Sequence, residues 1–114
     1  MSRFAEVLAR LVATIENRKG ADPTASYTTK LLSDPSLAAK KLGEEAIEAV
    51  IAATRGDKAA LAGESADLIY HWLVVLAAAG VSLDEVAAKL EAREGTSGLD
   101  EKAARPKERP NSSE

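Results

Sequence analysis

The stretch KKLGEEAIEAVIAA at Lys40–Ala53 and the stretch ESADLIYHWLVVL at Glu64–Leu76 decide the fold. In both, apolar residues recur at spacings of three and four, which is the period of an α-helix. A short turn at Arg55–Asp57, with glycine at its centre, separates the two stretches. The pattern therefore predicts helices over residues 34–55 and 57–79, packed side by side as an antiparallel pair.

Further helices are expected before and after this pair. Ser2 is a good N-cap for a helix that should stop near Lys19, where a glycine follows. The capping box Ser82-Leu83-Asp84-Glu85 predicts a last helix that ends near Arg93.

Two segments carry no regular period. Residues 20–29 are turn-rich and read as a loop, which leads into a short helical turn at Lys30–Leu32. The composition changes again at Gly95, and the last stretch is polar and rich in charge. We therefore expect an all-α domain at residues 1–94 and a partly disordered tail at residues 95–114.

Composition narrows the class of protein. The chain has 114 residues, 23 of them alanine and only four of them aromatic, which favours helices over a β-sandwich or barrel. The chain contains no cysteine and one histidine, which excludes disulfides and thiol catalysis and argues against a zinc site. A net charge of −3 argues against a nucleic-acid partner. No apolar run reaches the roughly 18 residues of a membrane span, and charges interrupt the N-terminus, so a cytoplasmic protein without a membrane partner is expected.

The two central helices are apolar on more than one side. In the first, Ile47, Val50 and Ile51 share the surface with several alanines. A helix that is apolar on two sides is buried on two sides, and four short helices cannot achieve this alone. We expect a four-to-five-helix up-down bundle that is completed by homodimerisation, as a homodimer or a higher oligomer.

Acidic residues cluster on the two central helices. Glu44, Glu45 and Glu48 lie within one turn of the first, and Glu64 and Asp67 lie three apart on the second. About eight residues separate Glu48 from the turn and the turn from Glu64, so the carboxylates come level across the pair. Like charges at about 4 Å repel by about 4 kcal/mol at an effective dielectric near 20. An all-oxygen set relieves that repulsion by binding Mg²⁺ or Mn²⁺, and such ions usually share their ligands with phosphates.

A plain structural interpretation stays open beside this one. Most acidic stretches of this type are solvated helix faces, paired here with lysines such as Lys40 and Lys41. His71, one further turn along from Asp67, is more often a packed histidine than a ligand.

Small polar and basic residues form two further candidate sites. Ser26, Tyr27, Thr28 and Lys30 lie just before the first central helix, and hydroxyls with a lysine suit phosphate. The segment Gly95–Gly98, followed by Lys102 and Arg105, is able to form an anion-binding nest. A capped turn and a frayed tail are the alternatives.

The combined pattern resembles a known family. E-E-x-x-E followed by E-x-x-D on the next helix resembles the MazG-like all-α nucleoside-triphosphate pyrophosphohydrolases. The stretches SYTTKLL at Ser26–Leu32 and REGTSGLDEKAAR at Arg93–Arg105, with the two quoted above, are similar to the phosphoribosyl-ATP pyrophosphohydrolase family within them. Together with the first helix they span nearly the whole chain.

The resemblance implies a Mg²⁺-dependent homodimeric hydrolase of histidine biosynthesis. It would split 1-(5-phosphoribosyl)-ATP into 1-(5-phosphoribosyl)-AMP and pyrophosphate. The family's metal ligands, carried over residue by residue, fall on Glu45, Glu48, Glu64 and Asp67. Either Glu44 or Glu48 would take the proton of the attacking water. The implied substrate-binding residues are Ser26, Tyr27, Thr28, Lys30, Lys41, Arg93, Thr96, Ser97 and Lys102.

Two other functions fit part of the pattern. The acidic motif alone also suits a housekeeping pyrophosphohydrolase of ordinary or modified dNTPs, although the Ser26–Lys30 segment argues against this. A non-catalytic helical dimerisation module would explain the apolar surfaces but gains nothing from the clustered carboxylates.

Overall fold

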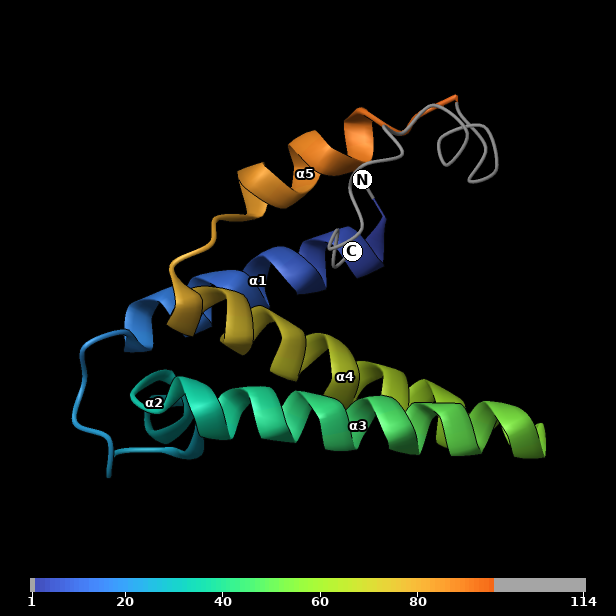
Figure 1. The fold of residues 1–114 in the computed structure, drawn as a ribbon, viewed down its shortest axis with the longest axis horizontal. Helices are drawn as coiled ribbons and strands as arrows, with labels where there is room; N and C mark the ends of the chain where they lie inside the picture. The colour runs from blue at the N-terminus through green and yellow to red at the C-terminus, as the bar shows by residue number, and fades with distance from the viewer. Residues whose placement is uncertain (1, 96–114) are drawn as a thin grey trace, which may run out of the picture. The chain divides into compact units, whose positions relative to one another are not determined.

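The computed structural model describes residues 2–95 of the chain, which divides into two compact units at residues 1–82 and 83–114. All regular structure in the described part is helical, which confirms the predicted all-α fold (Figure 1). The first unit contains α1 (Arg3–Arg18), α2 (Tyr27–Leu32), α3 (Pro35–Arg55) and α4 (Lys58–Ala79). The second contains α5 (Leu83–Glu91), which ends two residues before the predicted Arg93.

The long helices begin and end at the residues that the sequence predicts. The side chains of Ser2, Asp34 and Asp57 each accept a hydrogen bond from the backbone N–H three residues on. Gly56 and Gly80 end α3 and α4 in the left-handed conformation, at φ of 70° and 76°. These caps satisfy backbone groups that a helix leaves unpaired at its ends.

The short helix α2 begins earlier than expected. It starts at Tyr27, so the prediction of a loop over residues 20–29 is wrong for its last three positions. Ser26 accepts a hydrogen bond from the backbone N–H of Thr29, and the Thr29 hydroxyl accepts one from the N–H of Ser26. This reciprocal cap uses threonine where the common pattern has glutamate or glutamine, so the sequence signal is weak.

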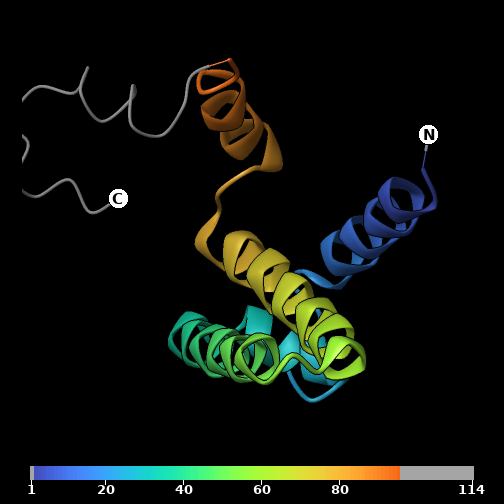
Figure 2. The ribbon, with the colours of Figure 1, turned by 90° about the vertical axis from the view of Figure 1, so that its right-hand side faces the viewer.

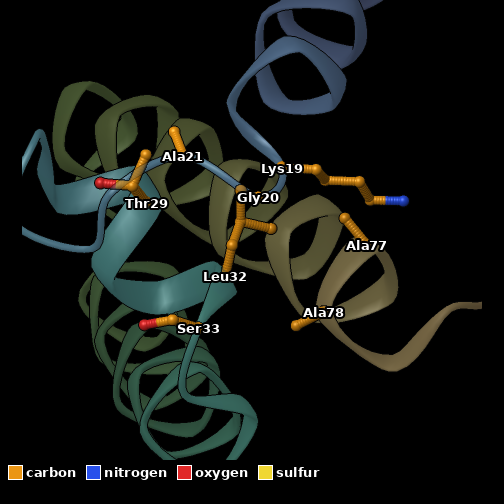
Figure 3. A pocket seen from close by; sticks show the side chains of 8 residues that line it. All are labelled: Lys19, Gly20, Ala21, Thr29, Leu32, Ser33, Ala77 and Ala78. Atoms are coloured by element: carbon orange, nitrogen blue, oxygen red, sulfur yellow. The ribbon is translucent and has the colours of Figure 1, made fainter.

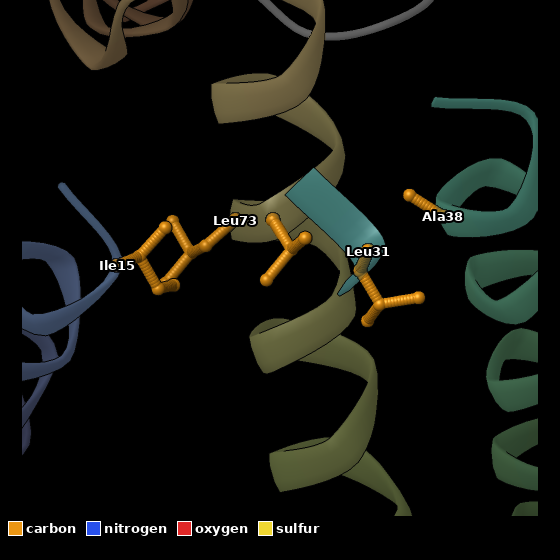
Figure 4. Packing of buried hydrophobic residues seen from close by; sticks show 5 residues of the cluster. Ile15, Leu31, Ala38 and Leu73 are labelled. Atoms are coloured by element: carbon orange, nitrogen blue, oxygen red, sulfur yellow. The ribbon is translucent and has the colours of Figure 1, made fainter. Parts of the chain in front are cut away.

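The helices α3 and α4 form the antiparallel pair that the sequence predicts. Figures 1 and 2 show them side by side along most of their length, and α2 contacts both. The core lies where four helices meet, with Ile15 from α1, Leu31 from α2, Ala38 from α3, and Leu73 and Val74 from α4 (Figure 4). This core holds α2 against the end of the helix pair and fixes where its side chains lie.

By length and mean hydropathy, α4 is able to cross a membrane. It also carries Glu64 and Asp67 and packs against α1, α2 and α3. The core helix of a globular unit passes the same length and hydropathy test, and these contacts fit that interpretation.

The outer face of α3 is apolar but uncovered in the single chain. Ile47 and Val50 are 61% and 63% exposed, and Ile51 is exposed as well. Burial of this helix on two sides is therefore not achieved within residues 2–95 of one chain. The predicted homodimer remains the expectation that would complete it.

Candidate active site

Three carboxylates meet between α3 and α4. One ligand oxygen each from Glu45 on α3 and from Glu64 and Asp67 on α4 lies within 4.8 Å of the others. The antiparallel arrangement brings Glu45 of α3 level with Glu64 of α4. Asp67 follows Glu64 by three residues, so it lies about one turn further along the same face of α4. Among the described residues, these three side chains are the group whose ligand atoms lie close enough together to hold a metal ion.

The electrostatics of Glu64 reflect this crowding. Partial desolvation raises its pKa above the ordinary value of 4.5, and the charges of Glu45, Glu48 and Asp67 raise it further. A hydrogen bond with Glu45 acts in the same direction. The negative charge gathered here therefore makes the protonated form of Glu64 more favourable than in an isolated side chain, because protonation relieves the repulsion.

A hard divalent cation fits this donor set. The three carboxylates are oxygen donors, two half-buried and one exposed, which leaves room for waters or phosphate oxygens in the coordination shell. The observed crowding of negative charge is the second indication, since a bound cation would neutralise it. Zinc is a poor fit, because nitrogen or sulfur ligands are absent from this group.

The other two acidic residues of α3 differ from these three. Glu48 is close enough for its charge to raise the pKa of Glu64, but it lies outside the converging group. Glu44 forms an ion pair with Lys41, with 3.4 Å between Nζ and Oε1. The structure thus divides the predicted acidic residues into three that converge and two beside them.

The hydroxyls of the Ser26–Lys30 segment already have partners within the chain. Ser26 and Thr29 cap α2, and the Thr28 hydroxyl lies 2.6 Å from the hydroxyl of Tyr70. Thr28 is buried, whereas Lys30 is exposed. Ser26 and Thr28 therefore act first as structural groups here, and direct contact with substrate falls to exposed members of the segment.

Tyr27 connects this segment to the carboxylates. Its hydroxyl lies 3.0 Å from Nε2 of His71, whose Nδ1 lies 2.8 Å from the backbone oxygen of Asp67. Burial raises the pKa of the Tyr27 hydroxyl, opposed by Lys41 and reinforced by Tyr70, Glu45 and Glu44. Tyr27 is therefore protonated at neutral pH and lies beside the acidic group.

The sequence favoured a packed histidine over a ligand at His71, and the structure confirms this with an exposure of 7%, but the sequence predicted no partner for His71 or Tyr70. Both are adjacent on α4, and both bind α2 side chains more than 40 positions earlier. The four-residue spacing of Asp67 and His71 was visible and puts both on one face. Their partners on α2 were not, because no local pattern encodes a contact of that separation.

A pocket of about 270 Å³ lies between the α1–α2 connection and the C-terminal end of α4 (Figure 3). Its lining contains none of the predicted site residues: it consists of Lys19, Gly20, Ala21, Thr29, Leu32, Ser33, Ala77 and Ala78.

Four predicted substrate-binding residues lie outside the first unit or outside the described residues. Arg93 belongs to the second unit and is exposed. Thr96, Ser97 and Lys102 lie outside the described residues, as does nearly all of the predicted tail.

Fold and site together define a class: an all-α protein whose carboxylates face one another across a helix pair in a group that suits a divalent cation. The phosphoribosyl-ATP pyrophosphohydrolase family model matches residues 8–94. A phosphoribosyl-ATP pyrophosphatase from Caulobacter sp. (strain K31) is 73% identical, over 93% of this chain and 99% of the relative. Proteins with the same name from Cereibacter sphaeroides and Ruegeria pomeroyi are 63% and 59% identical, over 87% and 89% of this chain and 97% of each relative. The chain belongs to the phosphoribosyl-ATP pyrophosphohydrolase family.

Proposed function

We propose that this protein hydrolyses 1-(5-phosphoribosyl)-ATP to 1-(5-phosphoribosyl)-AMP and pyrophosphate, in histidine biosynthesis and in the cytoplasm. One observation carries the proposal: Glu45, Glu64 and Asp67 converge within 4.8 Å in a chain of this family. Polyphosphate substrates bring magnesium with them, and converging carboxylates are suited to receive it.

The converging residues would hold Mg²⁺, with Mn²⁺ as an alternative. When bound, the ion would offset charge on the phosphate oxygens and lower the pKa of a bound water. Glu45 and Glu64 would direct their negative charge at the ion. Glu48, which lies close by but outside this group, would complete the ligand set or remain available as a base.

Hydrolysis requires a group that takes a proton from the attacking water. The reaction breaks one of the two bonds of the oxygen that bridges the α- and β-phosphorus atoms. Of the two candidates, Glu44 is already engaged in an ion pair with Lys41. Glu48 has no such cation in the described structure, and we assign it the role of general base.

The positive charge for the phosphates comes from lysines. Lys41 lies beside the carboxylates, and its charge reaches the Tyr27 hydroxyl. Lys30 is exposed on α2, in the segment that Tyr27 ties to α4. Both are suited to contact the leaving pyrophosphate or the 5-phosphate of the substrate.

A second copy of the chain would cover the exposed apolar face of α3. Ile47, Val50 and Ile51 lie on that face and are exposed. A symmetric dimer buries the same patch on both copies, which is the simplest closed arrangement.

The experiment that tests the proposed function is a substrate panel. Purified protein is incubated with phosphoribosyl-ATP or with each of the four dNTPs, with and without Mg²⁺, and pyrophosphate is measured. Release from phosphoribosyl-ATP alone, and only with Mg²⁺, is the expected result. Release mainly from dNTPs would assign a housekeeping activity instead, and no release from any substrate would overturn the catalytic function.

A further inference from the structure

Two consecutive residues of α2 bind two consecutive residues of α4. The Tyr27 hydroxyl meets His71 at 3.0 Å, and the Thr28 hydroxyl meets the Tyr70 hydroxyl at 2.6 Å. The rings reinforce this arrangement, since those of Tyr27 and Tyr70 stack at 6.4 Å and that of His71 lies edge-on to both. These four residues, Tyr27, Thr28, Tyr70 and His71, form a latch between α2 and the carboxylate-bearing face of α4.

The backbone oxygen of Asp67 determines which atoms donate and which accept in the hydrogen bonds of the latch. The backbone oxygen of Asp67 is only an acceptor, so Nδ1 of His71 carries the hydrogen and donates it there. In the neutral ring, Nε2 is then an acceptor, and it receives the hydrogen of the Tyr27 hydroxyl. The hydroxyl hydrogen of Tyr27 is thereby used in the bond to His71. The hydroxyl oxygen is then able only to accept a hydrogen bond from any further group.

Burial distinguishes the two ends of this chain of hydrogen bonds. His71 is 7% exposed and inaccessible to substrate, whereas Tyr27 is 48% exposed. The Tyr27 hydroxyl lies within electrostatic reach of Lys41, Glu44 and Glu45. The Tyr27 side chain is therefore open to a ligand held by the carboxylates, whereas the imidazole is closed to it.

We propose that His71 and Tyr70 are positioning residues that present the Tyr27 oxygen to substrate as a hydrogen-bond acceptor. The group it receives is then a donor, such as a ribose hydroxyl or an adenine amino group. A phosphate oxygen, which is itself an acceptor, is disfavoured at this point. The inference rests on the proposed function, whose substrate carries both kinds of donor.

The test combines three variants and a double variant. Tyr27→Phe removes the hydroxyl and keeps the ring, His71→Leu removes the acceptor, and His71→Gln keeps an amide oxygen able to accept. For Tyr27→Phe we expect KM for phosphoribosyl-ATP to rise about five- to tenfold, as for one lost neutral hydrogen bond, with kcat within about twofold. His71→Leu should do the same, and the double variant should be no worse than either single change, because the residues act as one unit. His71→Gln should restore KM to within about threefold of the wild type.

Two further measurements separate positioning from simple structural support. The Kd for Mn²⁺, measured by calorimetry, should stay within about twofold in every variant, because the carboxylates are untouched. The control Thr54→Val removes an exposed hydroxyl that bonds the oxygen of Val50 on α3, and it should leave KM unchanged. An unchanged KM in Tyr27→Phe, or effects that simply multiply in the double variant, would overturn the proposal.

A readout without substrate tests the latch on its own. Urea unfolding of the wild type, the two single variants and the double variant forms a double-mutant cycle for Tyr27 and His71. A midpoint loss in the double variant smaller than the two single losses together is expected, and additive losses would overturn the latch. If the wild type releases no pyrophosphate from phosphoribosyl-ATP, the proposed function fails, while this cycle still reports on the latch.

Discussion

Glu45 of α3 and Glu64 of α4 meet as a hydrogen-bonded carboxyl pair, and the pKa of Glu64 is raised. In the metal-free protein the charges of the neighbouring carboxylates disfavour the ionised form of Glu64. A divalent ion bound between these carboxylates would offset the repulsion. The site is thus arranged so that cation binding, rather than folding, satisfies its charge.

Glu64→Gln should stabilise the metal-free protein and abolish its response to metal. Because the folded-state pKa is raised, stability falls as pH rises from about the ordinary value of 4.5 through the raised value. The neutral side chain removes this loss, so the Tm in EDTA at pH 7 should exceed that of the wild type. At a hundredfold excess over Kd, Mn²⁺ should add about 2.7 kcal/mol to the free energy of unfolding of the wild type and so raise its Tm. It should leave the Tm of the variant unchanged.

Glu6→Gln is the control for this measurement, because Glu6 is exposed on α1. It should leave both the Tm in EDTA and the Mn²⁺ response as in the wild type. A Glu64→Gln protein that still responds fully to Mn²⁺ would show that the ion binds elsewhere.

Glu48→Gln should separate catalysis from metal binding. Loss of the general base should lower pyrophosphate release by about 100-fold or more. The circular dichroism spectrum should be unchanged because Glu48 is exposed on α3, and the Kd for Mn²⁺ should stay within about threefold because Glu45, Glu64 and Asp67 remain. Activity within a few-fold of the wild type would remove Glu48 from the mechanism, and a large loss of Mn²⁺ affinity would place it among the metal ligands.

Val50→Glu should dissociate the proposed dimer. The side chain is 63% exposed in the single chain, so a charge is tolerated by the fold but not within an apolar contact between two copies. Sedimentation equilibrium should show a dimer for the wild type and a monomer for the variant. Ser36→Glu, which adds the same charge at another exposed position of α3, should remain dimeric. A monomeric wild type would contradict the dimer.

Gly63→Ala should stabilise the protein. Gly63 lies inside α4 with ordinary helical backbone, and an added Cβ meets nothing within 4 Å. Alanine in such a position gains about 0.5–1 kcal/mol over glycine, which raises the Tm by a few degrees in a domain of this size. Differential scanning calorimetry measures this, and a fall in Tm would mean that another surface packs against this face.

Much of the helical framework could be predicted, because it depends on local signals. The period of the apolar residues, the caps at Ser2, Asp34 and Asp57, and the stops at Gly56 and Gly80 are encoded within a few residues. Spacing from the turn predicted that carboxylates of α3 and α4 come together, but it put Glu48 level with Glu64, whereas Glu45 is the residue of α3 that converges with Glu64 and Asp67.

The missed features depend on contacts between distant residues. The start of α2 rests on a serine–threonine cap and on the burial of Leu31 among four helices. The pairing of Tyr27 with His71 spans 44 residues and requires α2 to lie against α4. No local pattern contains that placement, so the contact between His71 and Tyr27 emerged only from the structure.

We propose above all that the converging carboxylates of α3 and α4 support a magnesium-dependent hydrolysis. The most direct measurement is pyrophosphate release from phosphoribosyl-ATP over a Mg²⁺ titration, for the wild type and for Glu45→Gln. We predict saturable activation of the wild type, no release in EDTA, and a variant that needs far more Mg²⁺ or stays inactive at every concentration. Release without Mg²⁺, or the same activation curve for both proteins, would contradict the claim.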